Sequence, residues 1–143
     1  MAGTDMTRII SGFNGEYRFL SNFWMARIMV GGMWFSSSEH AYQAAKSLDP
    51  KDWALIQRCA SPGGAKRAGR HITLRPDWKS IKLEAMEEIL WAKFTQHPDL
   101  MRDLIMTRDM DLIETNTWGD TYWGVCKGKG ENHLGKLLMK IRG

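Results

Sequence analysis

The segment 77–95 constrains the fold most, because its apolar residues recur every three or four positions, which is the period of an α-helix. Asp77 stands where the N-cap of such a helix is expected. Charged residues separate the apolar positions, so one face of the helix must be covered by the rest of the chain. We therefore predict a core helix here, whose apolar stripe comprises Trp78, Ile81, Ala85, Met86, Ile89, Leu90, Ala92 and Phe94.

Length and composition indicate one globular domain. A chain of 143 residues can bury a single core but is too short for two ordinary domains, and we predict an N-terminal tail over residues 1–12 and a domain over 13–143. No apolar run approaches the roughly 20 residues that span a bilayer, so no membrane partner is expected. The first ten residues contain no apolar signal-peptide core, which favours a cytoplasmic protein. Composition indicates nothing about the oligomeric state.

Cysteine and histidine positions give no sign of a metal site. Cys59 and Cys126 are far apart and belong to no CxxC pair. The four histidines show no paired ligand spacing of the kind that zinc sites use. We predict an enzyme or binding protein that needs no metal and no cofactor.

The charge balance is basic, with a net charge of +4 and a pI of about 9.2. This permits attraction to phosphorylated ligands or nucleic acid, although such values are also common in proteins that bind neither. The most basic patch is formed by Lys66, Arg67 and Arg70. Such a patch is most often a solvated helix face, and a phosphate-binding rim is the alternative.

Shorter segments complete a helix-dominated α+β fold with a few short antiparallel strands. Gly31 and Gly32 separate the extended segments 26–30 and 33–35 as a hairpin turn would. Residues 17–20 and 111–116 are further extended candidates. Capping residues followed by proline predict helices starting at 50 and 62, the second ending at Gly69. Two more helices are predicted from Pro98 and after Asn132.

Residues 36–48 predict a helix with one polar face. Ser36 and Glu39 have capping-box spacing, and Ser38 is a competing N-cap. Helical steps of three and four residues place the side chains of Glu39, Tyr42, Gln43 and Lys46 on one face. That face gathers a carboxylate, a phenol, an amide and an amine within reach of one small ligand. In the alternative interpretation Glu39 only caps the helix and Lys46 is solvated.

A second polar cluster lies at 116–124, where two Trp-Gly pairs flank Asp120. Indoles supply flat apolar walls, and the glycines let backbone approach a ligand closely. The alternative is that the tryptophans pack in the core and Asp120 turns the chain. Arg18, Ser21 and Asn22 form a further polar group among aromatics, either at a turn or at a ligand.

Taken together, these motifs resemble the NADAR family, also called YbiA-like. The resemblance runs from about Phe13 to Arg142 and rests on several motifs in the same order. They are residues 17–23 (YRFLSNF), 38–46 (SEHAYQAAK), 65–66, 69–70, 91–94 (WAKF), 118–120 (WGD), 123–124 (WG) and 132–139 (NHLGKLLM).

The resemblance implies an N-glycosidic hydrolase that removes ADP-ribose from guanine bases of DNA or RNA. Other members are associated with cleaving small phosphoribosylamine intermediates of riboflavin synthesis, and a non-catalytic reader of ADP-ribose or nucleic acid is the alternative from another class. The implied catalytic residues are Glu39, Lys46 and Asp120. The substrate-binding residues expected with them are Arg18, Ser21, Asn22, Tyr42, Gln43, Trp118, Gly119, Trp123 and Asn132.

Two chemical routes suit these side chains. In the first, Lys46 attacks the anomeric carbon of an opened ribose and forms a Schiff base, while Glu39 moves protons and Asp120 stabilises charge on the sugar. In the second, the carboxylates assist an oxocarbenium-like transition state and Lys46 only binds. Both routes remain open at the level of sequence.

Overall fold

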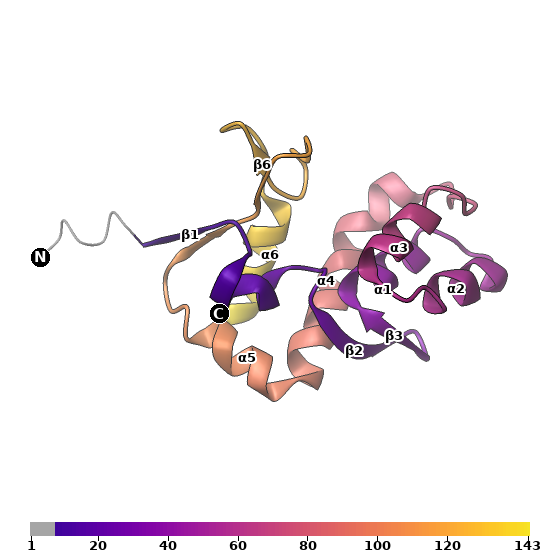
Figure 1. Cartoon of the computed structure of the whole chain (residues 1–143), viewed down its shortest axis with the longest axis horizontal. Coiled ribbons are helices and arrows are strands. Elements are labelled where there is room, and N and C mark those ends of the chain that lie inside the picture. The colour runs from indigo at the N-terminus through magenta and orange to yellow at the C-terminus, as the bar shows by residue number, and fades with distance from the viewer. Residues whose placement is uncertain (1–7) are drawn as a thin grey trace, which may run out of the picture. The chain divides into compact units, whose positions relative to one another are not determined.

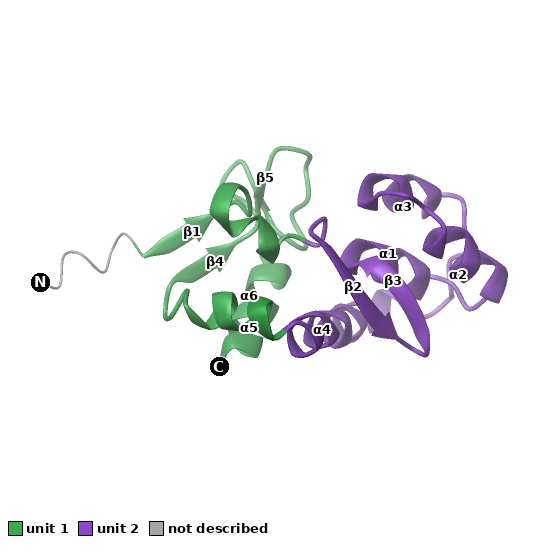
Figure 2. Cartoon of the chain, turned by 60° about the horizontal axis from the view of Figure 1, so that its bottom comes forward, with its two compact units in different colours: residues 1–21, 98–143 green, residues 22–97 purple. Residues whose placement is uncertain are grey.

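The computed structural model of the chain describes residues 8–143, which form two compact units. Unit 1 consists of the chain up to Ser21 and of Pro98–Gly143, and unit 2 is Asn22–His97 (Figure 2). Each unit has its own helices and its own paired strands. The predicted domain 13–143 thus comprises two centres of packing.

Unit 2 is built around α1 (Ser38–Ala45), which follows directly on a β-hairpin. The hairpin pairs β2 (Met25–Val30) with β3 (Met33–Ser37) in antiparallel register, and Gly31 and Gly32 turn the chain with φ of +58° and +81°. Positive φ at both central residues is what a two-residue hairpin turn needs. Helix α1 packs against the hairpin and three helices, as Figure 1 shows: α2 (Pro50–Gln57), α3 (Pro62–Ala68) and α4 (Trp78–Gln96).

Unit 1 combines two short parallel strand pairs with helices. Strand β1 (Ile9–Ser11) pairs with β4 (Asp111–Ile113), and β5 (Thr115–Asn116) pairs with β6 (Val125–Cys126). Helix α6 (His133–Arg142) packs against β4 and against α5 (Pro98–Ile105), while the 3₁₀ helix η2 (Gly15–Leu20) follows β1 (Figure 1).

The helix-dominated α+β class is confirmed, and two details of the prediction are wrong. Of the three strand pairs within residues 8–143, β2–β3 is antiparallel and the other two are parallel. Strands β1 and β4 come from distant parts of the sequence, and their long connection allows a parallel pair. Residues 17–20 lie in η2 and are not extended, because Tyr17 N donates to Asn14 O in an i→i+3 turn. The segment 111–116 is two strands, β4 and β5.

The predicted tail over residues 1–12 is only partly described. Residues 1–7 lie outside the described part of the chain, and Ile9–Ser11 form β1. None of the helices within residues 8–143 has the length and apolar character needed to cross a bilayer.

Candidate active site

The side chain that caps the N-terminus of helix α1 is a serine and not Glu39. Ser37, and neither Ser36 nor Ser38, is the N-cap: its Oγ accepts from His40 N at 3.2 Å. The fully buried His40 ring donates through Nε2 to Cys59 O at 2.9 Å, so its Nδ1 accepts from Ser37 Oγ at 2.7 Å. These contacts fix the start of α1 against the segment before α3. The capping interpretation of Glu39 is therefore wrong.

The Glu39 carboxylate is buried and bonded to its neighbour on the helix. It is 7% exposed, and its Oε2 accepts from Gln43 Nε2 at 2.6 Å. Gly69, just after α3, packs directly on the Gln43 carboxamide, where a β-carbon would overlap it. The close approach of α3 thus holds Gln43, and Gln43 in turn orients the carboxylate.

Three buried polar atoms around the start of α1 have no hydrogen-bond partner. They are Asn22 Oδ1, Ser38 Oγ and Gln43 Oε1, out of five such atoms in the part of the chain that the structure describes. Asn22 is held by its other groups: its carbonyl accepts from Glu39 N at 3.1 Å, and its amide lies 3.5 Å from Met86 Sδ. A buried polar atom without a partner costs about 1–3 kcal/mol. Such a concentration is typical of a functional site.

Lys46 closes α1 and has a lowered pKa. Burial of the amine is the largest cause, and the positive charges of Lys66, Arg70 and Lys82 lower the pKa further, while Glu39 acts in the opposite direction. The Nζ atom lies 5.3 Å from the centre of the Tyr42 ring. A lowered pKa makes the neutral, nucleophilic amine more available near neutral pH.

The backbone around Lys46 is held by its neighbours. Its carbonyl accepts from Arg75 N at 2.7 Å. The next residue, Ser47, donates to Asp52 Oδ2 at 2.6 Å and accepts at its carbonyl from Trp53 Nε1 at 2.7 Å. The same Asp52 oxygen accepts from Thr73 N at 3.0 Å. Helix α2 and the segment before α4 thereby fix the end of α1.

In unit 1, Asp120 organises a tight turn. Its Oδ1 accepts from the backbone N–H groups of Tyr122 and Trp123, at 3.1 and 2.9 Å. The buried Asn116 clamps the Asp120 backbone, accepting from its N at 3.0 Å and donating to its O at 2.8 Å. One carboxylate oxygen, Oδ1, therefore acts as predicted by the alternative in which Asp120 turns the chain. The other oxygen, Oδ2, takes no part in these bonds.

The remaining predicted residues of unit 1 differ in their surroundings. Trp118 is 62% exposed beside Gly119, whose φ of +87° suits glycine. The Trp123 ring meets Tyr122 edge-on at 4.8 Å. Asn132 does not cap α6 with its side chain: its Oδ1 accepts from Glu114 N and its Nδ2 donates to Leu112 O, both at 2.9 Å. Asn132 therefore has a structural task besides any role at a ligand.

The structure brings together five predicted residues within unit 2. They are Asn22, Glu39, Tyr42, Gln43 and Lys46. Within unit 1 it assembles Asp120, Trp123 and their loop, while Arg18 and Ser21 lie on and after η2, where Ser21 N donates to Arg18 O at 3.0 Å. Within residues 8–143 no three histidine, cysteine or acidic side chains gather as a metal site would require.

Sequence reasoning missed three residues that shape these sites. The sequence places Asn116 in a polar run, and only the fold shows that its amide clamps the turn at Asp120. The sequence predicts that Gly69 ends α3, but the contact of Gly69 with Gln43 has no sequence signal. Lys82 is one of the charges between the apolar positions of 77–95, and only the packing of α4 shows that it acts on Lys46.

A buried carboxylate and an amine of lowered pKa on one helix face are groups of the kind that proton transfer and nucleophilic attack on a small polar group require. The chain belongs to the NADAR family: the model of the NADAR domain matches residues 12–143. The resemblance inferred from the motifs is thereby confirmed.

Named relatives cover most of this chain. The N-glycosidase YbiA of Escherichia coli is 43% identical over 130 residues, which are 89% of this chain and 81% of YbiA. The NMR structure of E. coli YbiA matches with a TM-score of 0.84 at 42% identity, covering 94% of this chain and 82% of YbiA. A riboflavin biosynthesis protein of Vibrio vulnificus is 37% identical over 130 residues, 89% of this chain but only 35% of that protein. The prediction of a hydrolase of N-glycosyl bonds is confirmed at this level.

Proposed function

We propose that this chain removes ADP-ribose from guanine bases of nucleic acid, with Lys46 as a Schiff-base nucleophile. The observation that carries the proposal is the pairing of Lys46, whose pKa is lowered, with the buried Glu39 on the same helix. The guanine substrate is the one that membership of the family implies. The basic pI of about 9.2 is compatible with approach to a nucleic acid.

The reaction begins with opening of the ribose ring. The bond between the anomeric carbon and the ring oxygen breaks, Glu39 supplies a proton to that oxygen, and the base nitrogen carries the resulting positive charge. The neutral Lys46 amine then adds to the anomeric carbon, and guanine leaves with the proton that Lys46 gives up. The remaining imine joins Lys46 to ADP-ribose. Water hydrolyses this protonated imine to the free aldehyde of ADP-ribose and the Lys46 ammonium group. The ammonium passes its extra proton to Glu39, which restores both side chains, and the sugar ring closes.

The neighbours of the two groups support these roles. Gln43 fixes one oxygen of Glu39 by a 2.6 Å hydrogen bond, which positions the carboxyl for proton transfer. The Tyr42 ring packs at 5.3 Å from both Lys46 Nζ and the ring of Trp78, so the amine lies against an apolar wall. The unpartnered Asn22 Oδ1 is an acceptor in the same region.

A phosphoribosylamine is the second candidate substrate. The relative from E. coli is named an N-glycosidase, and the relative from Vibrio vulnificus is named a riboflavin biosynthesis protein. A phosphoribosylamine carries the same bond between an anomeric carbon and nitrogen. The chemistry described for Lys46 and Glu39 applies to it without change.

The deciding experiment offers both substrates under trapping conditions. The chain is incubated with an ADP-ribosylated guanosine oligonucleotide, and in parallel with a phosphoribosylamine, each with and without borohydride. Released sugar is measured by chromatography and the adduct is located by mass spectrometry. We expect free ADP-ribose without borohydride and a reduced ADP-ribosyl adduct on Lys46 with it. Lys46→Arg should abolish both, since a guanidinium cannot form an imine, whereas Lys79→Arg, at an exposed position, should change neither.

Each departure from this result has a defined meaning. Full turnover in Lys46→Arg would exclude the Schiff base and favour the carboxylate-assisted route. Cleavage of the phosphoribosylamine alone would transfer the proposal to the second substrate. Tight binding of the oligonucleotide with no release of sugar from either substrate would identify a reader.

A further inference from the structure

We propose that Lys66, Arg70 and Lys82 form a binding subsite beside Lys46 for a phosphate ester on the ribose of the substrate. The three residues are called the cationic rim below. The inference deepens the proposed function and rests on it, because it names the part of that substrate which the rim holds. It starts from how α3 and α4 pack against α1.

Two of the three cations come from the end of α3, Lys66 from its last turn and Arg70 from the residue after its C-cap. Ala65 is fully buried and Gly69 packs on Gln43, so this face of α3 lies against α1. Lys66 and Arg70 each follow one residue after these contacts. The Lys66 Nζ lies 6.0 Å from the centre of the Phe23 ring, which places it over the segment that follows Asn22.

Helix α4 brings the third cation from the other side. Trp78 packs against Tyr42 with ring centres 5.3 Å apart, and Met86 Sδ lies 3.5 Å from the Asn22 amide. Lys82 is one helical turn after the first of these contacts and one turn before the second. Residues four apart share a face of a helix. Lys82 therefore projects between Tyr42 and Asn22, on the side of α4 that meets α1.

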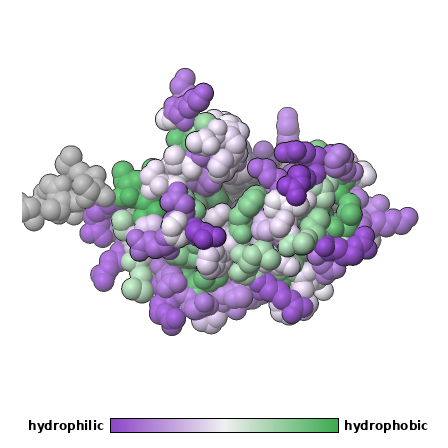
Figure 3. Space-filling view, in the orientation of Figure 1, coloured by the Kyte–Doolittle hydropathy of each residue, from purple (hydrophilic) through white to green (hydrophobic). Residues whose placement is uncertain are grey.

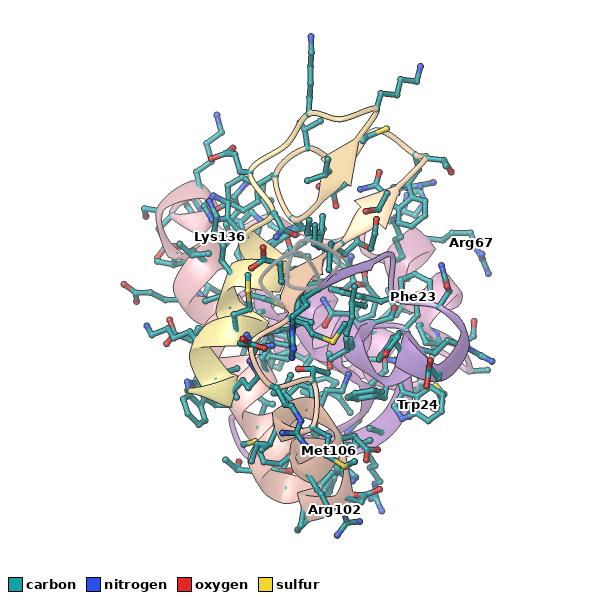
Figure 4. All side chains as sticks on the ribbon, turned by 90° about the vertical axis from the view of Figure 1, so that its left-hand side faces the viewer. Phe23, Trp24, Arg67, Arg102, Met106 and Lys136 are labelled. Atoms are coloured by element: carbon teal, nitrogen blue, oxygen red, sulfur yellow. The ribbon has the colours of Figure 1, made fainter. Side chains whose placement is uncertain are left out.

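The electrostatics agree with this placement. All three rim charges lower the pKa of Lys46, and Arg67, the cation between two of them in sequence, does not act on it. Figure 4 shows Arg67 extending outward at the edge of the molecule, and Figure 3 shows hydrophilic side chains gathered over the region of α3. The rim is thus a selected subset of the basic patch seen in the sequence.

The helix dipole accounts for one part of this arrangement, because Lys66 lies in the last turn of α3, where a cation is favoured. It does not account for Lys82, which lies in the first half of α4. Three cations whose charges all act on the Lys46 amine suit an anion. A phosphate ester, with two or more oxygen acceptors, is such a group on both candidate substrates.

The test measures binding separately from turnover. Dissociation constants for ADP-ribose, ribose 5-phosphate and ribose are determined by calorimetry at low salt, for the wild type and for Lys66→Gln, Arg70→Gln and Lys82→Gln. Arg67→Gln on α3 and Lys79→Gln on α4 are the matched controls. Lys82→Met removes the charge but keeps an apolar stem at this position, which guards against loss of packing. Thermal melting verifies that each variant is folded.

We expect each rim variant to weaken binding of the phosphorylated ligands about tenfold or more, as is usual for a lost hydrogen bond to a charged group. Ribose should bind equally to all variants, and the two controls should behave as the wild type. Loss for both phosphorylated ligands identifies a site for the phosphate bonded directly to the ribose, and loss for ADP-ribose alone identifies a site that needs the diphosphate; either result supports the rim.

Two results would contradict the proposal that the cationic rim binds a phosphate ester. One is unchanged affinity for ADP-ribose and ribose 5-phosphate in the rim variants. The other is an equal loss in Arg67→Gln, which would show attraction by net charge alone. Because binding is measured without catalysis, a chain that binds ADP-ribose through the rim yet releases none from guanine would contradict the proposed function and leave the rim standing.

A kinetic readout gives a second criterion. Glu39, Lys66, Arg70 and Lys82 are the charged groups that act on Lys46. Removing a positive neighbour raises the pKa of Lys46, so the pH at which borohydride trapping reaches half its maximum should move upward in Lys82→Gln. A pH profile identical to that of the wild type would place Lys82 outside the subsite.

Discussion

Gly69 lies so close to Gln43 that a β-carbon at this position would overlap the Gln43 carboxamide. The backbone of Gly69 is helical, with φ of −61°, so the conformation itself would accept any residue. Glycine is needed here for space. The contact matters because the same carboxamide holds Glu39 at 2.6 Å.

Gly69→Ala should therefore reduce turnover without unfolding the protein. Moving Gln43 releases the Glu39 carboxyl from its orientation, and displacements of about 1 Å at a catalytic group can cost about a hundredfold in rate. Overpacking should lower the free energy of unfolding by about 1–3 kcal/mol. Steady-state kinetics and urea denaturation measure the two effects.

Gly63→Ala is the matched control on the same helix. A β-carbon there would meet Arg67 Nη1 at 3.6 Å, an ordinary contact, and alanine stabilises a helix over glycine by roughly 0.5–1 kcal/mol. It should keep full turnover. Equal activity of the two alanine variants would show that the position of Gln43 is unimportant for the reaction.

Glu39→Gln should remove activity and leave stability nearly unchanged. The N-cap is Ser37, and a glutamine at position 39 can still accept from Gln43, so packing and capping survive. Loss of a general acid–base group typically costs about 10²–10⁴ in rate. Ser37→Ala removes the N-cap side chain and should lower the free energy of unfolding by about 1 kcal/mol or more. A Glu39→Gln variant that melts early but turns over normally would restore the structural interpretation of this residue.

Two variants of Asp120 distinguish its role in the turn from a role in the reaction. Asn keeps an oxygen that accepts from Tyr122 N and Trp123 N, so Asp120→Asn should melt as the wild type does. Ala leaves these two N–H groups without their acceptor and should cost about 1–3 kcal/mol. If the carboxylate takes part in the reaction, turnover falls in both variants. Wild-type kinetics in Asp120→Asn would reduce Asp120 to a turn residue.

Lys93 should make stability depend on pH. The side chain is fully buried on α4, and burial lowers its pKa from 10.5 to about 7. Between these two values the unfolded chain binds more protons than the folded one, so the free energy of unfolding should rise with pH, by at most about 1.4 kcal/mol per unit. Urea denaturation from pH 7 to 10 measures the slope.

Lys93→Met removes the titrating group and keeps most of its volume, so it should flatten that slope relative to the wild type. Lys79→Met, at an exposed position of the same helix, should leave the slope as it is. Parallel pH profiles for the wild type and Lys93→Met would show that the buried amine keeps its ordinary pKa.

Local sequence signals predict much of the fold correctly. Asp49–Pro50 and Ser61–Pro62 do begin α2 and α3, because a capping side chain and a proline act within one turn. The polar face of residues 39–46 is also predictable from the sequence, since helical spacing alone places Glu39 and Lys46 together. Family motifs then added what spacing could not, namely the class of reaction.

What sequence could not supply depends on contacts between distant segments. The parallel pairing of Ile9–Ser11 with Asp111–Ile113 joins residues about a hundred positions apart and leaves no local trace. Lys82 acts on Lys46 because α4 packs against the rest of unit 2 through the contacts of Trp78 with Tyr42 and of Met86 with Asn22. For Asn132, the same short polar side chain that suits a helix cap also suits a clamp on a neighbouring strand, and the structure adopts the clamp.

The hydrogen bond from Arg75 N to the Lys46 carbonyl has a consequence for how the amine moves. Arg75 holds the carbonyl of Lys46, and the next residue, Ser47, is held by Asp52, so the main chain at the end of α1 is anchored. The position of the amine therefore changes by rotation about the four carbon–carbon bonds of the side chain. If Lys46 forms the proposed imine, the length of the lysine side chain sets how far from the anchored backbone that bond lies.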